Sequence, residues 1–224
     1  MSVAARLALC GVVASSAGDE EPAGATTVSY TFSGSTKPPG IVDKATTAGA
    51  GASLVTSGTL QEGNSSTSNG GYNSLAVFPD EMASSEFEVT VTVGSLSSAA
   101  NNRAVGGACA SADGTVAVYC RVPSSSGTAV IGTYVGGVET DRATLSSQSA
   151  VPGNTITLTP SVSGGVVTWT VTKNGAALGA GLSWTDSGHL VDLPGVHPAV
   201  AFRHQYSAGQ YPSRGVTALS AEVI

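Results

Sequence analysis

The sequence is poor in charged residues, and this limits the partners that it can have. Only 11% of its 224 residues are charged, and nine Lys and Arg stand against fifteen Asp and Glu, which gives a net charge of -6. Nucleic-acid phosphates are bound by clustered Lys and Arg, whereas the three lysines and six arginines of this chain are scattered. The composition therefore argues against a nucleic-acid partner.

Long apolar runs and helical periodicity are also lacking. No run approaches the ~20 apolar residues that a membrane span needs, so no span is predicted. No apolar repeat with the 3.6-residue period of a helix is sustained along the chain. A length of 224 residues suits one all-β domain. A domain of this size buries roughly 70% of its unfolded surface and needs neither a disulfide nor a metal to fold.

Cysteine is scarce as well, and its number is odd: Cys10, Cys109 and Cys120. The count therefore leaves the redox compartment undetermined. If Asp113-Gly114 forms a two-residue turn, Cys109 lies opposite Val118, and the two thiols share a face one step out of register. This offset makes a disulfide awkward and favours two buried thiols that act as small apolar side chains, although a different turn would align them.

What is present is a clear alternation of apolar and polar residues. From Glu86 to Val93 the odd positions are apolar and the even positions polar, which is the period of a strand with one buried face. A second strand is predicted from Arg103 to Ser111, and a return strand from Thr115 to Val122. On the return strand Tyr119 and Arg121 share the polar face.

Other short strands with turn signals between them predict an antiparallel β-sandwich or jelly roll over residues 26–224. Hairpins are predicted across Gly136-Gly137 and Asn174-Gly175, and loops over 33–50 and 61–71. The other predicted strands are 26–32, 52–60, 72–78, 128–135, 138–145, 154–162, 165–173, 198–204 and 215–223.

Three segments carry a family resemblance: Glu86–Val91, the pair Gly106–Cys109 and Val116–Tyr119, and Trp169–Gly175. Their order resembles the concanavalin A-like, laminin-G-like sandwich over most of 26–224. Gly-, Ala- and Thr-rich sandwiches of this kind are also similar to minor tail and decoration proteins of phages of actinobacteria. The resemblance implies binding of a carbohydrate or of a protein surface and does not specify a ligand.

No catalytic constellation is found. Glu86 and Glu88 share a strand face, but the glycosidases that the resemblance includes carry a third acid and an Asp between the two Glu, where this chain has Phe87. We therefore predict a non-enzymatic protein without cofactor or metal. The three histidines are predicted as loop residues without nearby ligand partners: His189, His197 and His204.

A cluster of polar and aromatic residues beyond residue 202 is the predicted binding surface. Tyr and Arg side chains in a loop suit contact with a sugar or with another protein, and the alternative is a loop that packs on its own sandwich. Tyr119 and Arg121, on the polar face of the strand 115–122, are expected to extend this binding surface. The predicted binding residues are Tyr119, Arg121, Arg203, His204, Tyr206 and Tyr211.

Residues 1–17 divide the functional hypotheses. They contain one Arg, a short apolar run and small residues, which fits either an apolar arm or a secretory signal peptide. In the first hypothesis residues 1–25 are an arm and joint that dock on other virion subunits, and the chain is a phage structural protein, with a homotrimer as the expected symmetry. In the alternative, 1–17 is a signal, and the chain is a secreted carbohydrate-binding or glycosidase-like module.

Overall fold

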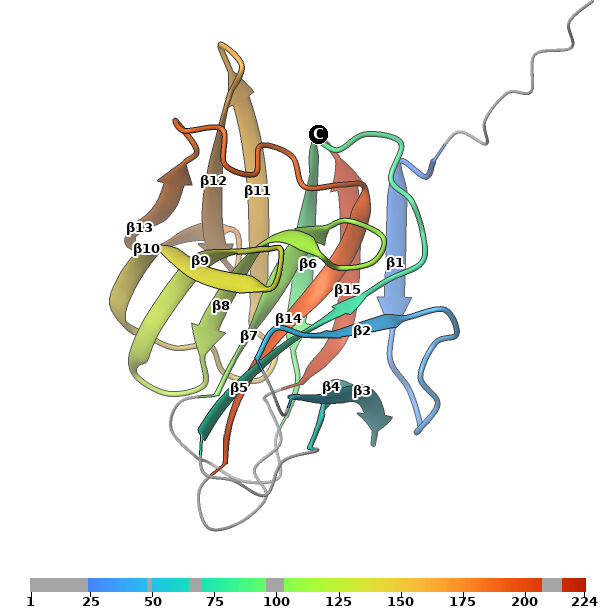
Figure 1. Ribbon diagram of the computed structural model, residues 1–224. Coiled ribbons are helices and arrows are strands. Elements are labelled where there is room, and N and C mark those ends of the chain that lie inside the picture. The colour runs from blue at the N-terminus through green and yellow to red at the C-terminus, as the bar shows by residue number, and fades with distance from the viewer. Residues whose placement is uncertain (1–23, 48–49, 65–69, 96–102, 207–214) are drawn as a thin grey trace, which may run out of the picture.

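The computed structural model describes residues 24–47, 50–64, 70–95, 103–206 and 215–224, which form two antiparallel β-sheets packed face to face (Figure 1). Within these ranges there is no helix, and hence none that could cross a bilayer. The all-β sandwich expected from the alternation is confirmed. The expected arm, and the signal peptide that is its alternative, lie outside the described residues.

One layer is an eight-stranded sheet that carries the central strand of the sequence pattern. β6 has its odd residues buried, as the alternation predicted. In spatial order the sheet contains β13 (Ala176–Thr185), β12 (Val166–Lys173), β11 (Thr155–Ser163), β6 (Phe87–Val93), β15 (Val216–Val223), β4 (Thr59–Asn64) and β3 (Ala50–Thr56), with β1 (Thr27–Thr31) paired to β15.

The other layer is a seven-stranded sheet. Although β6 and β7 follow each other in sequence, β7 belongs to this second layer, and the chain therefore changes sheet between them. In spatial order the sheet contains β10 (Val138–Gln148), β9 (Gly127–Val135), β8 (Val116–Pro123), β7 (Ala104–Ala110), β14 (His197–Tyr206), β5 (Gly70–Val77) and β2 (Val42–Ala45).

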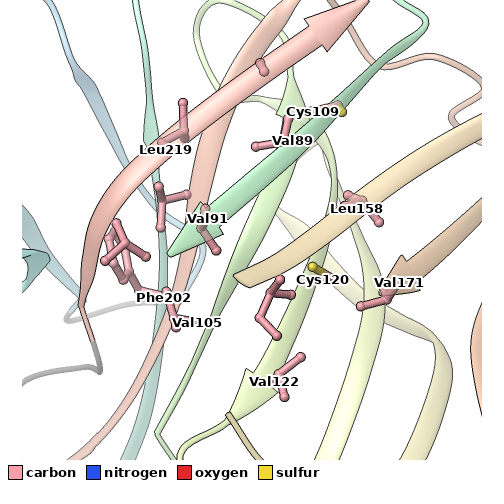
Figure 2. Packing of buried hydrophobic residues seen from close by; sticks show 14 of the residues in the cluster. Val89, Val91, Val105, Cys109, Cys120, Val122, Leu158, Val171, Phe202 and Leu219 are labelled. Carbon is pink, nitrogen blue, oxygen red and sulfur yellow. The ribbon is translucent and has the colours of Figure 1, made fainter. Parts of the chain in front are cut away.

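The main core lies between the two sheets, where side chains of both inner faces meet (Figure 2). Val89 and Val91 of β6 and Leu158 of β11 come from one layer, and Val105 and Phe202 come from the other; all are fully buried. Burial of aliphatic and aromatic side chains contributes about 1.5–3 kcal/mol each, and the core therefore holds the layers together.

The two thiols of the hairpin β7–β8 are buried in this core. Cys109 pairs in register with Val118, as predicted for a turn at Asp113-Gly114, and both cysteines are free. Burial raises the pKa of Cys120 to about 12. Burial also raises the pKa of Cys109 well above its usual value, and the nearby Cys120 is a second cause of this rise. Both groups are therefore protonated thiols that pack as small apolar side chains.

The predicted glycine turns are correct, and one turn was missed. Residues Gly136, Gly137, Asn174 and Gly175 all have positive φ angles, as two-residue hairpin turns require. The predicted strand 52–60 is instead two strands, because Ser57-Gly58 has φ angles of 50° and 74° and reverses the chain between β3 and β4. A Ser-Gly pair is a weaker turn signal than Asn-Gly, and the run of apolar residues on both sides concealed it.

The two predicted loops also contain strands. The segment 33–50 contains β2, which pairs with β5 at one edge of the seven-stranded sheet, and β4 extends through Asn64 into the predicted loop 61–71. β2 has four residues, with the sequence Val-Asp-Lys-Ala. Its pattern is too short to identify a strand locally, and its pairing with β5 defines it.

The loop between β13 and β14 is organised by one buried carboxylate. Asp186 is 1% exposed and accepts three backbone N–H groups, from Leu190 to Oδ1 and from Val191 and Asp192 to Oδ2, each at 2.9 Å. Burial by itself raises the pKa of Asp186, but the three N–H donors and the neighbouring His189 outweigh it and hold the pKa below the ordinary value.

We expect Asp186→Ala to lower the free energy of unfolding by about 2–4 kcal/mol, because three backbone N–H donors that organise the loop lose their acceptor. Since the folded-state pKa is lowered, this contribution is present above the unfolded-state pKa of about 4 and is lost as the pH falls through the lower value. Urea unfolding at several pH values tests this. The difference between the two proteins should shrink at the most acidic pH, and a constant difference would contradict the assignment.

Candidate binding site

Three of the predicted binding residues lie together on one face of the molecule. Tyr119 and Arg121 of β8 and Arg203 of β14 lie on the outer face, by which we mean the face of the seven-stranded sheet turned away from the eight-stranded sheet. The residues adjacent to them on the same strands, Cys120 on β8 and Phe202 on β14, belong to the main core on the opposite face of the sheet. The outer face also carries a smaller buried cluster: Leu75, Val77, Ala108, Ala110, Ala117, Tyr119, Tyr134, Ala199 and Ala201.

The other three predicted residues are placed differently or lie outside the description. The predicted strand 198–204 already covers Arg203 and His204, but the loop expected after it is wrong for Gln205 and Tyr206, which continue β14 and pair with Gly71 and Gly70 of β5. The side chains of His204 and Tyr206, and all of Tyr211, lie outside the described residues. Pairing with β5 extends the strand, a long-range effect that the local Gln, Tyr and Gly content conceals.

Glu139 of β10 is the centre of the polar network on the outer face. Its Oε1 accepts from Tyr119 Oη at 2.5 Å and forms an ion pair of 2.5 Å with Arg121 Nη2. Its Oε2 accepts from Asn73 Nδ2 at 2.8 Å and from Thr46 Oγ1 at 3.4 Å. Both carboxylate oxygens are thus used twice, and Glu139 ties β10 to β8 and β5.

Tyr119 reaches Glu139 across an intervening strand. Gly132 of β9 lies directly opposite Tyr119, and a Cβ at Gly132 would overlap the Tyr119 ring. The absence of a side chain at Gly132 therefore lets the ring lie across β9. Burial raises the pKa of Tyr119 well above its ordinary value; Arg121 opposes this rise, and Glu139 adds to it. The phenol remains a proton donor at any physiological pH.

Arg121 is held rigidly, with a side chain that is only 4% exposed. Besides Glu139, its Nη2 donates to Tyr119 Oη at 3.2 Å and lies 3.7 Å from Asp141 Oδ1, and its guanidinium carbon is 4.6 Å from the centre of the Tyr119 ring. Asp141 is 51% exposed and presents a carboxylate to solvent. A buried arginine with an acid, a phenol and an aromatic face around it is preorganised for binding.

Two cavities adjoin this network, and Arg121 and Arg203 line both. The arginine cavity, of about 230 Å³, is lined by both arginines, by Ala104, Pro123 and Val130, and by the loop residues Ser125, Ser126, Gly127 and Thr128. The mixed-charge cavity, of about 500 Å³, is lined by Thr47, Asn73, Arg121, Glu139, Thr140, Asp141 and Arg203. The arginine pair thus separates a cavity without acids from one with two acids.

Three buried polar atoms at these cavities have no hydrogen-bond partner within the described ranges: Asn73 Oδ1, Arg121 Nε and Arg203 Nε. A buried polar atom without a partner costs about 1–3 kcal/mol, so most such atoms are paired in native proteins. All three atoms belong to side chains that line the two cavities, although the atoms themselves are buried beneath the surface.

The sequence analysis did not include Asn73, Glu139 or Asp141 among the predicted binding residues. A signal was available for two of them, because the correctly predicted hairpin across Gly136-Gly137 places Glu139 opposite Tyr134 and Asp141 opposite Gly132. These positions share the face of Tyr119. Asn73 gave no local signal, because its proximity to Glu139 depends on the order of strands in the sheet.

The two histidines whose side chains are described, His189 and His197, do not line either cavity. The prediction of a loop position is wrong for His197, which begins β14, is 6% exposed and lies 3.0 Å from the Phe78 carbonyl oxygen through Nδ1. It is correct for His189, which is exposed and pairs with Asp192 at 2.9 Å. In the part of the chain that the structure describes, no group of three or more His, Cys, Asp or Glu side chains could hold a metal ion.

No family model matches the sequence, and no curated protein matches it. Among solved structures, the chain is similar to the Emp47p carbohydrate recognition domain, with 11% identity over 87% of this chain and 94% of that one and a TM-score of 0.52. It is also similar to peanut lectin with a 9-residue peptide, with 13% identity, coverage of 88% and 97% and a TM-score of 0.48.

A third similar structure is the carbohydrate binding module CBM66 from Bacillus subtilis, with 14% identity, coverage of 84% and 96% and a TM-score of 0.43. At these identities a likeness concerns the fold alone. Together with the two antiparallel layers described above, the likeness to the Emp47p domain shows that this protein has the concanavalin A-like β-sandwich fold.

Proposed function

We propose that the protein is a carbohydrate-binding module whose site is the outer face around Arg121, Asn73 and Asp141. The observation that carries this proposal is the pair of adjoining cavities lined by polar side chains, among them Arg121, Arg203 and the exposed Asp141. A sugar hydroxyl both donates and accepts, and can therefore pair with the carboxylate of Asp141 and with a neighbouring cavity-lining donor in one binding event. The fold that the chain shares with a carbohydrate recognition domain supports the same function.

The sizes of the cavities support a small polar ligand. Ligand sites commonly measure about 300–1,000 Å³, and the two cavities of about 230 and 500 Å³ on either side of the arginine pair fall in this range when taken together. The lining of the mixed-charge cavity includes Asp141, whose carboxylate is exposed to solvent. Exposed carboxylates and amides accept pairs of sugar hydroxyls well, because each of their oxygens has two acceptor positions.

The arrangement of acids favours binding over hydrolysis. Glycosidases need two free carboxyl groups, one of which supplies a proton. Glu139 uses both oxygens to hold Tyr119, Arg121 and Asn73, and this leaves Asp141 as the accessible acid of the mixed-charge cavity. The other pair considered in the sequence is remote, because Glu88 lies on β6 in the opposite sheet and accepts from Thr159 at 3.1 Å.

A virion role is the weaker proposal. It depends on docking through residues 1–17, which lie outside the described residues, and the likenesses to solved structures give it no support. The lectin-like alternative accounts for the polar network and the cavities, neither of which an assembly role requires. The glycosidase-like variant of that alternative is disfavoured by the full use of Glu139.

A glycan array probed with the labelled protein tests the proposed function. We expect binding to a subset of glycans, and we expect Asn73→Ala to weaken that binding about tenfold, since it removes one acceptor worth about 1.4 kcal/mol. Asn154→Ala is the matched control, because the Asn154 side chain likewise makes one protein hydrogen bond, accepting from Val151 N through Oδ1 at 2.9 Å, and lies in a turn between β10 and β11, away from both cavities. Absence of binding to every glycan, or equal binding by Asn73→Ala, would refute the proposal.

A further inference from the structure

The arginine cavity has a distinct charge pattern. Two of the six arginines of an acidic chain line it, and none of the described residues that line it is acidic. The remaining lining groups are small or hydroxyl-bearing residues of β7, β8, β9 and the connection 124–126. A cavity with two guanidinium groups and hydroxyl groups favours a ligand oxygen that carries negative charge.

Arg203 is not neutralised by the protein. It is partly buried, and within the described ranges it has neither an ion pair nor a hydrogen bond, and its Nε is fully enclosed. Its register partners on the two neighbouring strands are Asn73 and Ala104, neither of which is acidic. A partly buried cation without a counter-charge loses hydration without compensation, so the site gains most from an anionic ligand group.

Arg121 differs from Arg203 because one of its guanidinium nitrogens, Nη2, already has protein partners. Its Nη2 contacts Glu139, Tyr119 and Asp141, which fixes the plane of the guanidinium. The positive charge that lines the arginine cavity is therefore positioned before any ligand arrives. Two arginines that line one cavity, one fixed and one unpaired, form a suitable receptor for the oxygens of a carboxylate or a sulfate group.

Aromatic stacking cannot replace charge on this face as far as it is described. Many sugar-binding sites obtain their affinity from an exposed aromatic ring, but the two tyrosines here, Tyr119 and Tyr134, are 2% and 4% exposed. The affinity of this site therefore has to come from hydrogen bonds and ionic contacts. Charge-assisted hydrogen bonds are about twice as strong as neutral ones, which again favours an acidic ligand.

We propose that the ligand is an acidic saccharide whose carboxylate or sulfate group binds between Arg121 and Arg203, at the arginine cavity. Its neighbouring hydroxyl groups extend into the mixed-charge cavity toward Asn73 and Asp141. This inference rests on the proposed carbohydrate-binding function and specifies the class of sugar. The carboxylate and the sulfate share one chemistry at the site, and the binding experiment separates them.

Isothermal titration with four polymers tests the inference: polygalacturonate, its methyl ester, dextran sulfate and dextran. If a carboxylate is bound, polygalacturonate binds at least about tenfold more tightly than its methyl ester, which lacks the charge. If a sulfate is bound, dextran sulfate exceeds dextran by a similar factor. In either case Arg203→Gln should weaken binding about tenfold. Arg203→Lys should retain part of the affinity, because the lysine ammonium group keeps the positive charge but not the two-pronged geometry of the guanidinium.

The control variant is Lys173→Gln, which removes one positive charge from β12 in the opposite sheet, where Lys173 Nζ contacts the Ser149 carbonyl oxygen at 3.0 Å. It should bind as the wild type does. Arg203→Gln should also unfold at the wild-type denaturant concentration or higher, because Arg203 has no ion pair or hydrogen bond to another described residue that the substitution would remove. A loss of binding can therefore be separated from a loss of folding.

Two results would overturn the inference. Equal binding of charged and uncharged polymers, or wild-type affinity in Arg203→Gln, would refute the acidic ligand while leaving carbohydrate binding in place. Failure to bind any polymer, together with a blank glycan array, would refute the proposed function and this inference with it.

Discussion

Replacement of Arg121 by Met is expected to lower the free energy of unfolding by about 3–5 kcal/mol. The reason is the carboxylate that it leaves behind. Glu139 is 13% exposed and has lost most of its water, and the 2.5 Å ion pair with Arg121 is its main compensation. Met fills a similar volume but offers no charge, so Glu139 remains as an uncompensated and largely buried anion.

A double-mutant cycle with Glu139→Leu distinguishes this cause from a loss of packing. Glu139→Leu alone should cost less than Arg121→Met, since Asp141 at 3.7 Å can still compensate Arg121. The double variant should recover much of the loss, because replacing both members of a buried pair by apolar residues is often neutral. Guanidinium unfolding measures all three. Strictly additive losses would show that Arg121 and Glu139 do not interact as described.

The second large effect is expected at Trp169, the largest fully buried side chain of the described residues. Trp169 lies on β12, between Pro160 of β11 and Trp184 of β13 in the register of the eight-stranded sheet. Trp169→Ala should lower the free energy of unfolding by about 3–5 kcal/mol, through lost apolar burial and the cavity that remains. Thermal and guanidinium unfolding measure the loss.

Two variants serve as comparisons for Trp169→Ala. Trp169→Phe keeps an aromatic ring and removes an indole Nε1 that has no partner among the described residues, so it should cost well under half as much. Trp184→Ala should also cost less, because Trp184 is only partly buried and one of its faces lies 5.7 Å from the guanidinium of Arg142. A loss at Trp184 equal to that at Trp169 would contradict the proposed position of the core.

Several features of the site depended on which strands become neighbours. The hydrogen bond between Asn73 and Glu139 joins residues that are 66 positions apart and that lie on β5 and β10. Arg203 meets Arg121 only because β14 inserts beside β7 in the seven-stranded sheet. Local sequence patterns carry no information on such pairings, and the end of β14 at Gln205 and Tyr206 was therefore predicted as a loop although it pairs with β5.

The sequence alone determined the strand periodicity, the buried face of β6 and the glycine hairpins, whereas the predicted polar face of β8 is itself buried at Tyr119 and Arg121. Those properties are local: side chains alternate with a period of two, and positive φ angles favour Gly and Asn. The strands β6, β8, β9 and β12 were therefore correct, as was the register that separates Cys109 from Cys120. The tertiary structure alone decided the order of strands in each sheet, and with it which residues meet at the candidate binding site. The reason is that contacts between distant segments are selected by the packing of the whole domain, which no short stretch of sequence encodes.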